Sequence, residues 1–376
     1  MSTDVTALRR SPFLPVIASL VLLLAGPVLA GCTSATSGDD TAGVATPRLA
    51  DVTAVNEPRS WEGPSTAVAP SSPVDPITEG EQSLPVTVTD RQGTTVEIDD
   101  TSRILALDIY GSLSRTVFEL GLGDQVVGRD ASSGFTEIAD RPLVTQNGHD
   151  LNAEAILELA PTLIITDTSL GPWDTVLQMR DAGVDVVVVD SHRAIDSIGS
   201  LVGEVAAALG VPERGALLAE RISVAVDETV AEIAGIAQAD GEKLRMIFLY
   251  VRGQSGVYYM FGEESGADAL ITALGGADVS SEIGWSGMRP ITDEGLVAAN
   301  PDLVLVMTGG LESVEGVDGL LEAVPALQQT PAGEHRRVVD MADSQILSFG
   351  PDTARVLEAL AVAVYAPDAA AAGAAG

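Results

Sequence analysis

Three continuous apolar runs constrain the fold of this chain more than any other feature. They are Ile104–Leu107, Leu163–Thr166 and Val184–Val189, and each precedes a longer stretch with helical periodicity. Strands buried on both faces of a parallel sheet have this pattern. The second half repeats the alternation, which predicts an α/β protein throughout; its runs are Arg245–Tyr250, Leu303–Val306 and Val338–Val339, with a closing helix over Thr353–Tyr365.

A long helical pattern lies between the two sets of runs. It extends from Glu213 to about Gln238, roughly 40 Å at 1.5 Å per residue, which is longer than one small domain needs. We therefore expect an α/β lobe over residues 84–211, a connecting helix over 212–240 and a second α/β lobe over 241–367. One apolar stripe of the helix is expected to be buried; it contains Leu217, Leu218, Ile222, Val226, Val230 and Ile233.

One short pattern occurs in both predicted lobes. Glu154 stands seven residues before Pro161, which stands two residues before the run at Leu163. Glu294 has the same relation to Pro301 and Leu303. The repetition favours a duplicated helix-turn-strand unit and a two-lobed architecture.

The beginning of the chain has the pattern of an export signal. Arg9 and Arg10 precede an apolar run over Phe13–Ala30 that is interrupted too early to be a membrane span. The run ends in Leu29-Ala30-Gly31-Cys32, which resembles the bacterial lipoprotein box. The resemblance implies a signal peptide over residues 1–31, cleavage before Cys32, and acyl chains on that residue. A secretory signal with an incidental cysteine is the alternative.

Two segments lack apolar periodicity. Residues 32–83 are rich in Ser, Thr, Pro, Gly, Asp and Ala, and are expected to form an unstructured tether after the lipidated cysteine. Residues 368–376 consist almost entirely of Ala and Gly, and we expect them to be unstructured too.

Charge and cysteine content exclude several functions. The formal net charge of −34 would repel a phosphate backbone, which excludes nucleic-acid binding. A single cysteine excludes an intrachain disulfide, a thiolate zinc cluster and an iron–sulfur cluster. Any metal must therefore be bound by His, Tyr or carboxylate side chains. Motifs of hydrolases, zinc proteases and phosphate-binding loops are also absent from the sequence, so we expect no enzyme activity.

Export, a lipid anchor, two lobes and one long helix together resemble the solute-binding lipoproteins of bacterial ABC importers. The resemblance implies the class III periplasmic-binding-protein-like fold, with two Rossmann-like lobes linked by one long α-helix. It also implies that Glu154 and Glu294 dock against arginines of the permease. Without it, each glutamate would be read as a solvated carboxylate that complements a helix dipole.

The three histidines differ in their surroundings. His149 lies in a Gly-containing turn, Gln146–Leu151, before the first repeated helix, and His192 follows the strand that ends at Asp190. His335 lies in a charged turn and is interpreted as a surface residue, whereas the role of His192 stays open.

Tyr250 ends the first strand of the second half, and Arg252 follows two residues later. Residues two apart on an extended segment share one face, so the guanidinium can reach the phenol oxygen and stabilise the phenolate. A phenolate is a suitable ligand for ferric iron, and Tyr and His both occur as axial haem ligands. A tyrosine packed at the core edge is the alternative.

The Asn147-Gly148-His149 turn and the Tyr250-Val251-Arg252 strand end are similar to the haem-binding lipoproteins of actinobacterial haem importers. Val127-Gly128-Arg129-Asp130 and Gly350-Pro351 also match that family. The resemblance implies that His149 and Tyr250 ligate the haem iron, the only metal expected, on opposite faces, with Arg252 bonded to the tyrosine. Arg129 is a candidate for a haem propionate or for a structural ion pair. Trp285, Met288 and Met307 are candidates for lining the apolar cleft or for ordinary core positions.

These features predict an exported, lipid-anchored protein on the outer face of the cytoplasmic membrane. It would capture haem in the interlobe cleft and deliver it to an ABC permease with its ATPase, and upstream haem-donor proteins are further candidate partners. One alternative is the same fold with a ferric siderophore or cobalamin as ligand. Another is an exported surface protein without a transport role.

Overall fold

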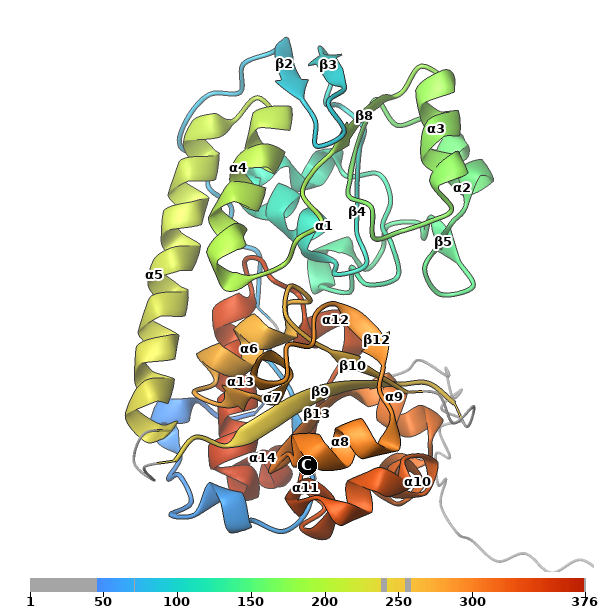
Figure 1. Ribbon diagram of the computed structural model, residues 1–376. Coiled ribbons are helices and arrows are strands. Elements are labelled where there is room, and N and C mark those ends of the chain that lie inside the picture. The colour runs from blue at the N-terminus through green and yellow to red at the C-terminus, as the bar shows by residue number, and fades with distance from the viewer. Residues whose placement is uncertain (1–45, 71, 238–241, 254–257, 375–376) are drawn as a thin grey trace, which may run out of the picture. The chain divides into compact units, whose positions relative to one another are not determined.

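The structure, a computed structural model, describes residues 46–70, 72–237, 242–253 and 258–374 (Figure 1). The predicted signal peptide and Cys32 lie outside these residues. In the part of the chain that is described, no helix combines the length and the apolar character needed to cross a membrane.

The first lobe contains a parallel sheet in the order β4-β7-β8, formed by Ile104–Leu107, Leu163–Thr166 and Asp185–Val188. All residues of β4 and β7 are buried, as their continuous apolar sequence requires. An antiparallel hairpin of β2 (Val86–Thr89) and β3 (Thr95–Ile98) precedes the sheet. The other elements are α1 (Ser112–Val117), β5 (Thr145–Gln146), β6 (Asp150–Leu151), α2 (Ala153–Glu158), α3 (Trp173–Asp181) and α4 (Ile198–Ala208).

The second lobe contains a mixed sheet in the order β1-β14-β13-β9-β10-β12, with β11 beside β9. The predicted strands are present and parallel, whereas β10 and β12 run antiparallel to their neighbours. The strands are β1 (Ser65–Ala67), β9 (Arg245–Val251), β10 (Tyr258–Phe261), β11 (Ala277–Asp278), β12 (Met288–Pro290), β13 (Leu303–Met307) and β14 (Val338–Met341). The helices are α6 (Ala267–Ala273), α7 (Val279–Glu282), α8 (Asp293–Ala299), α9 (Thr308–Ser313), α10 (Gly316–Ala323), α11 (Pro331–Glu334), α12 (Asp343–Ile346), α13 (Thr353–Tyr365) and α14 (Pro367–Ala374).

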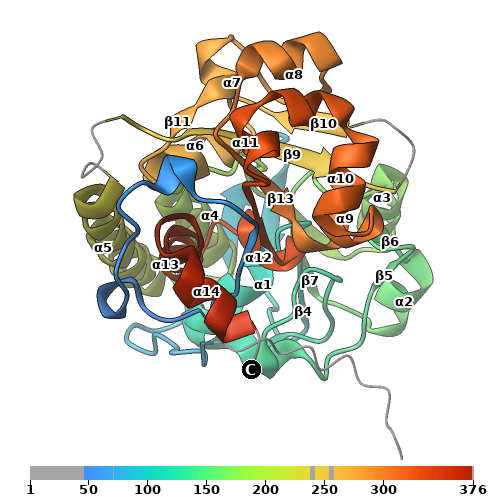
Figure 2. The same ribbon diagram turned by 90° about the horizontal axis from the view of Figure 1, so that it is seen from below.

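The predicted long helix is α5, over Pro212–Ala237, and it runs beside elements of both lobes (Figures 1 and 2). It packs against α4 of the first lobe and against α13 of the second. Leu218, Ile222, Val226 and Ile233 are buried along one stripe. Leu217 does not belong to this stripe, because it lies one residue off the four-residue spacing and is 48 % exposed.

The structure corrects the prediction of an unstructured tether for residues 46–70 and 72–83, whereas residues 32–45 and 71 lie outside the described residues. Residues 46–70 lie against the second lobe and residues 72–83 against the first, and strand β1 pairs with β14 and forms the edge of the second-lobe sheet. Leu49 and Ile77 are buried in the core. The buried Arg337 guanidinium donates to the Ser65 hydroxyl at 3.1 Å. These partners are distant in sequence, so composition and local periodicity could not indicate them.

The chain end is likewise more ordered than predicted. Residues 367–374 form helix α14, and Ala370 is buried, whereas the sequence predicted an unstructured segment over 368–376. Alanine has the highest helix propensity, and proline at the first helical position is favourable. The low-complexity composition of this segment therefore did not indicate helix α14.

Two glycines permit close contact between the lobes. A side chain at Gly266, whose φ is +87°, would place its Cβ 2.8 Å from the carbonyl oxygen of Arg193. A side chain at Gly350 would place its Cβ 3.1 Å from the Cβ of Ser112. Both contacts join the second lobe to the first, which gives Gly350 a packing role.

Candidate functional site

His149 lies in the loop of a short hairpin in the first lobe. Strands β5 and β6 pair antiparallel on either side of Asn147-Gly148-His149. Asn147 and Gly148 have φ angles of 51° and 95°, which asparagine and glycine adopt more readily than other residues. The sequence therefore forms the predicted turn and leaves His149 exposed.

Tyr250 lies near the end of β9 in the second lobe and is half-buried. Arg252 Nε donates to its phenol oxygen at 3.3 Å, and the guanidinium carbon lies 5.4 Å from the centre of the phenol ring. The predicted contact between these two side chains is therefore present. This contact places the positively charged guanidinium beside the oxygen that would carry the negative charge of a phenolate.

The other end of the Arg252 guanidinium is held by Asp343, at the start of α12. Arg252 Nη2 forms an ion pair and hydrogen bond with Asp343 Oδ2. Burial lowers the pKa of Arg252, but the hydrogen bonds to Asp343 and Tyr250 outweigh this effect and raise it above its ordinary value. Arg252 is thus a permanent cation beside Tyr250.

Several aromatic and methionine side chains share the sheet face that carries Tyr250. Tyr259 of β10 is paired directly with Tyr250, and their ring centres are 6.4 Å apart. Met288 of β12 is paired with Phe261 on the same face. Met307, at the end of β13, packs against the cluster that contains Phe248 and is therefore on this face too. Tyr259 was not predicted; recognising that Tyr258–Phe261 pairs with β9 would have revealed it.

Trp285 occupies a different position from the two methionines. Its Nε1 donates to the carbonyl oxygen of Met260 at 3.0 Å, and its ring packs against the cluster on the opposite face of the sheet. The Arg289 guanidinium carbon lies 4.6 Å from the centre of the indole ring. The structure therefore does not group Trp285 with Met288, Met307 and Tyr250.

Arg129 is half-buried in the first lobe. Its guanidinium donates to the carbonyl oxygens of Asp130 and Ser133, at 3.3 and 3.4 Å. None of the carboxylates in the described ranges lies within ion-pair distance of it, so the alternative of a structural ion pair receives no support. A side chain at the preceding Gly128 would place its Cβ 2.6 Å from Leu159 Cδ1, so the packing around it would have to shift.

A buried cluster of charges was not predicted. Asp108 and Asp167 directly follow β4 and β7, and Arg193 contacts both carboxylates, at 3.3 and 2.6 Å. Burial, reinforced by the charge of Asp108, raises the pKa of Asp130 to about 7. Burial also raises the pKa of Asp167. The ends of parallel strands were the signal that could have identified this cluster.

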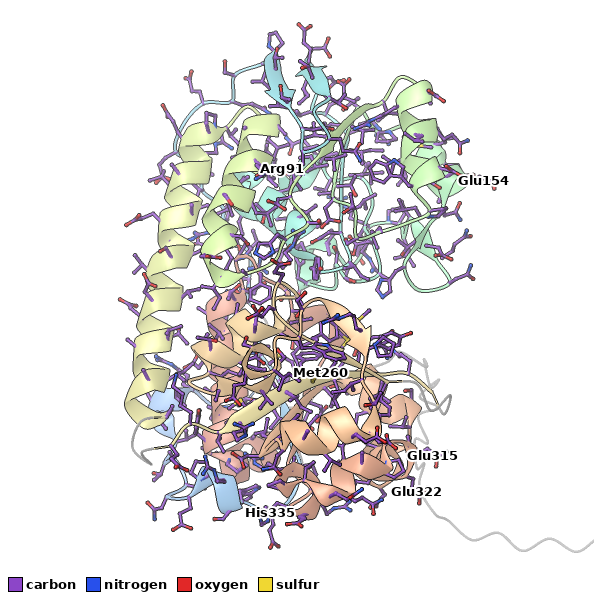
Figure 3. The ribbon with its side chains drawn as sticks, in the orientation of Figure 1. Arg91, Glu154, Met260, Glu315, Glu322 and His335 are labelled. Carbon is purple, nitrogen blue, oxygen red and sulfur yellow. The ribbon has the colours of Figure 1, made fainter. Side chains whose placement is uncertain are left out.

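The other two histidines lie elsewhere. His192 is exposed and lines a groove of about 830 Å³ with residues of α5 and α6, such as Val226 and Ala273. His335 ends α11, near the bottom of the second lobe in Figure 3. Within the described ranges, no group of three or more His, Cys, Asp or Glu residues is arranged to hold a metal ion.

The repeated helix-turn-strand unit is present in both lobes. Asn152 caps α2 and Thr292 caps α8, which places Glu154 and Glu294 two residues after the respective caps. Each helix is followed by a residue with positive φ, Ala160 or Asn300, immediately before the proline. Both glutamates are exposed, and Figure 3 shows Glu154 at the outer edge of the first lobe.

An arginine that the sequence analysis missed completes each unit. Arg103, just before β4, donates from Nε to the Leu159 carbonyl oxygen at 2.9 Å. Arg245, at the start of β9, donates from Nη2 to the Ala299 carbonyl oxygen at 2.9 Å. Each arginine thus binds the carbonyl end of its repeated helix, which supports the duplication independently of the glutamates.

Solved structures similar to this chain include several haem-binding proteins. The haem-binding protein HmuT is 41 % identical, with a TM-score of 0.77, and the match covers 82 % of this chain and 99 % of that chain. RhuT from Roseiflexus sp. RS-1, in apo form, is 36 % identical, with a TM-score of 0.62, over 72 % of this chain and 100 % of its own. BhuT in complex with two haems is 29 % identical, with a TM-score of 0.61, over 70 % of this chain and 98 % of its own.

Three further HmuT structures carry alanine in place of a histidine, a tyrosine, and an arginine two positions after that tyrosine. No curated protein matches the chain significantly. Residues 109–344 match the family described as periplasmic binding protein. This match covers more than half of the chain and includes parts of both lobes and the helix between them. The chain therefore belongs to the periplasmic binding protein family, as a two-lobed member whose lobes are joined by one long helix.

Proposed function

We propose that this protein captures haem between its two lobes and delivers it to an ABC permease for import. His149 of the first lobe and Tyr250 of the second would be the axial ligands of the iron. The observation that carries the proposal is the Arg252 hydrogen bond to the Tyr250 phenol oxygen, because it prepares the phenol to bind as a phenolate. The chain has the same order of histidine, tyrosine and arginine as the three HmuT variants, with the arginine again two positions after the tyrosine.

Binding requires each lobe to supply one ligand and the second lobe to cover the porphyrin. The Tyr250 phenol would transfer its proton to solvent as its oxygen binds ferric iron, and Arg252 would stabilise the resulting phenolate. Tyr259, Met288 and Met307 share the Tyr250 face and offer apolar surface to the ring. Arg129 would bind a propionate, since its guanidinium bonds only to carbonyl oxygens among its described partners.

Titration of the purified full chain with ferric haem tests this function. We expect a saturable Soret band, and His149→Ala should weaken haem binding and change the spectrum because one axial ligand is lost. His192→Ala is the matched control, since that histidine is also exposed but lies in the groove beside α5 and α6. The absence of a Soret band with the unmodified chain would exclude haem; binding of a ferric siderophore or cobalamin would then support the alternative ligands.

We propose that Glu154 and Glu294 bind arginines of the permease from opposite lobes. Their equivalent, exposed positions in a duplicated unit support this role. Replacing both with lysine should reduce haem import by roughly tenfold or more while leaving haem binding intact, because like charges at an interface repel. Haem import into cells or into permease-containing vesicles measures this effect. Glu322→Lys, at an exposed residue of the second lobe, is the control. Unimpaired import by the double variant would contradict the docking role.

The family implies an extracytoplasmic location, and we propose a lipid anchor at Cys32. The segment Leu29-Ala30-Gly31-Cys32 supports acylation of this residue, and several acyl chains give stable anchoring. Labelling with a radioactive fatty acid should mark the protein and should fail for Cys32→Ser. Failure to label the unmodified protein would disprove the anchor.

A further inference from the structure

Three neighbouring strands of the second lobe end around the Arg252 guanidinium. Arg252 follows β9, Gly309 lies two residues after β13, and Asp343 lies two residues after β14; the three strands are parallel and adjacent. The carboxyl ends of such strands meet at one edge of the sheet. These residues therefore converge through the topology of the sheet, although they are far apart in sequence.

The contacts connect the three residues to Tyr250. Gly309 N donates to Asp343 Oδ1 at 2.9 Å, Asp343 Oδ2 pairs with Arg252 Nη2, and Arg252 Nε donates to the Tyr250 phenol oxygen at 3.3 Å. The guanidinium is a rigid planar fork, so holding one end fixes the direction of the other. The fork needs this support, because the Arg252 side chain is 39 % exposed.

We infer that Asp343 is a positioning residue for the tyrosine ligand, and this inference rests on the proposed function. Asp343 holds the Arg252 guanidinium in the orientation in which Nε donates to the phenol oxygen. It does not contact that oxygen itself among the bonds that the structure shows. Its removal would leave Arg252 in place as a charge but without its second anchor.

Gly309 belongs to the same arrangement. A Cβ at this position would lie 2.9 Å from Arg252 Nη1 and 3.1 Å from Asp343 Oδ1, so a side chain there would force the two charged groups to shift. Gly309→Ala therefore perturbs the pair without altering either charged residue. This substitution is therefore a second way to disturb the orientation of the Arg252 guanidinium.

Ferric haem complexes of the full chain provide the test. We expect Asp343→Ala to shift the visible spectrum toward that of Arg252→Ala and to lower haem affinity by roughly tenfold, because one charge-assisted hydrogen bond is weakened. Acidification should displace the tyrosine ligand at a higher pH in this variant, since a less stabilised phenolate takes up a proton more readily. Gly309→Ala should show the same changes.

Asp343→Asn should fall between the unmodified protein and Asp343→Ala, because its amide oxygen can accept from the guanidinium or from Gly309 N, whereas its amide nitrogen cannot accept from the other donor. Glu322→Gln is the charge-matched control; Glu322 is exposed on the second lobe and is labelled in Figure 3. The inference is overturned if Asp343→Ala binds haem with an unchanged spectrum and acid transition while Arg252→Ala does not. If the unmodified chain gives no Soret band, the proposed function itself has failed.

Discussion

Replacing Tyr250 with phenylalanine is expected to remove the phenolate-to-iron charge-transfer band and to lower haem affinity by at least about a hundredfold. Residues that only support a metal ligand already account for 10- to 100-fold effects, so loss of the ligand itself should exceed them. The substitution keeps the ring that packs between Tyr259 and Phe261 and removes only the oxygen that Arg252 contacts. Visible spectroscopy and haem titration measure both effects.

Tyr259→Phe is the matched control for this experiment. Tyr259 is paired with Tyr250 on the same sheet face, is also half-buried, and has no hydrogen bond to Arg252. We expect its complex to retain the charge-transfer band. A Tyr250→Phe complex with an unchanged spectrum would contradict ligation, and loss of the band only in Tyr259→Phe would assign the ligand to the neighbouring strand.

The elements with the strongest local patterns were predicted correctly from the sequence. The apolar runs of β4, β7 and β13 lie where expected, and α13 has the predicted bounds, because strands buried on both faces and amphipathic helices require these patterns. Strand β1 was missed for the opposite reason. Its three residues form a strand because they pair with β14, and a local sequence pattern cannot indicate a partner that is so distant in the chain.

In the candidate site, too, only the contact within one segment could be predicted from the sequence. The Tyr250–Arg252 contact could be predicted because both residues lie on one extended segment. Asp343 and Gly309 could not, because the parallel sheet brings them to Arg252 from separate segments. The separation of Trp285 from Met288 was also hidden, since it depends on which sheet face each residue meets.

Asp130 is expected to make the stability of the first lobe depend on pH. Its Oδ1 accepts hydrogen bonds from the Ser132 and Ser133 amides, at 2.9 and 2.8 Å, so asparagine can keep both bonds. In the folded protein its pKa is raised from 3.8 to about 7 by burial and by Asp108, so the folded state binds a proton that the unfolded state releases. Folding stability from this group is therefore present below about pH 4 and is lost as the pH rises to about 7.

Asp130→Asn should remove this loss. The difference in unfolding free energy between the variant and the unmodified protein is expected to increase by up to about 4 kcal/mol from pH 4 to pH 8. This is the free energy that corresponds to the gap between the unfolded-state pKa of 3.8 and the folded-state pKa of about 7. Urea unfolding of the haem-free chain across this pH range measures the difference. Asp140→Asn, at an exposed aspartate in the same lobe, is the matched control. A constant difference for Asp130→Asn would mean that this carboxyl is ionised in the folded lobe, and that Arg193 compensates the charges of Asp108, Asp130 and Asp167 together.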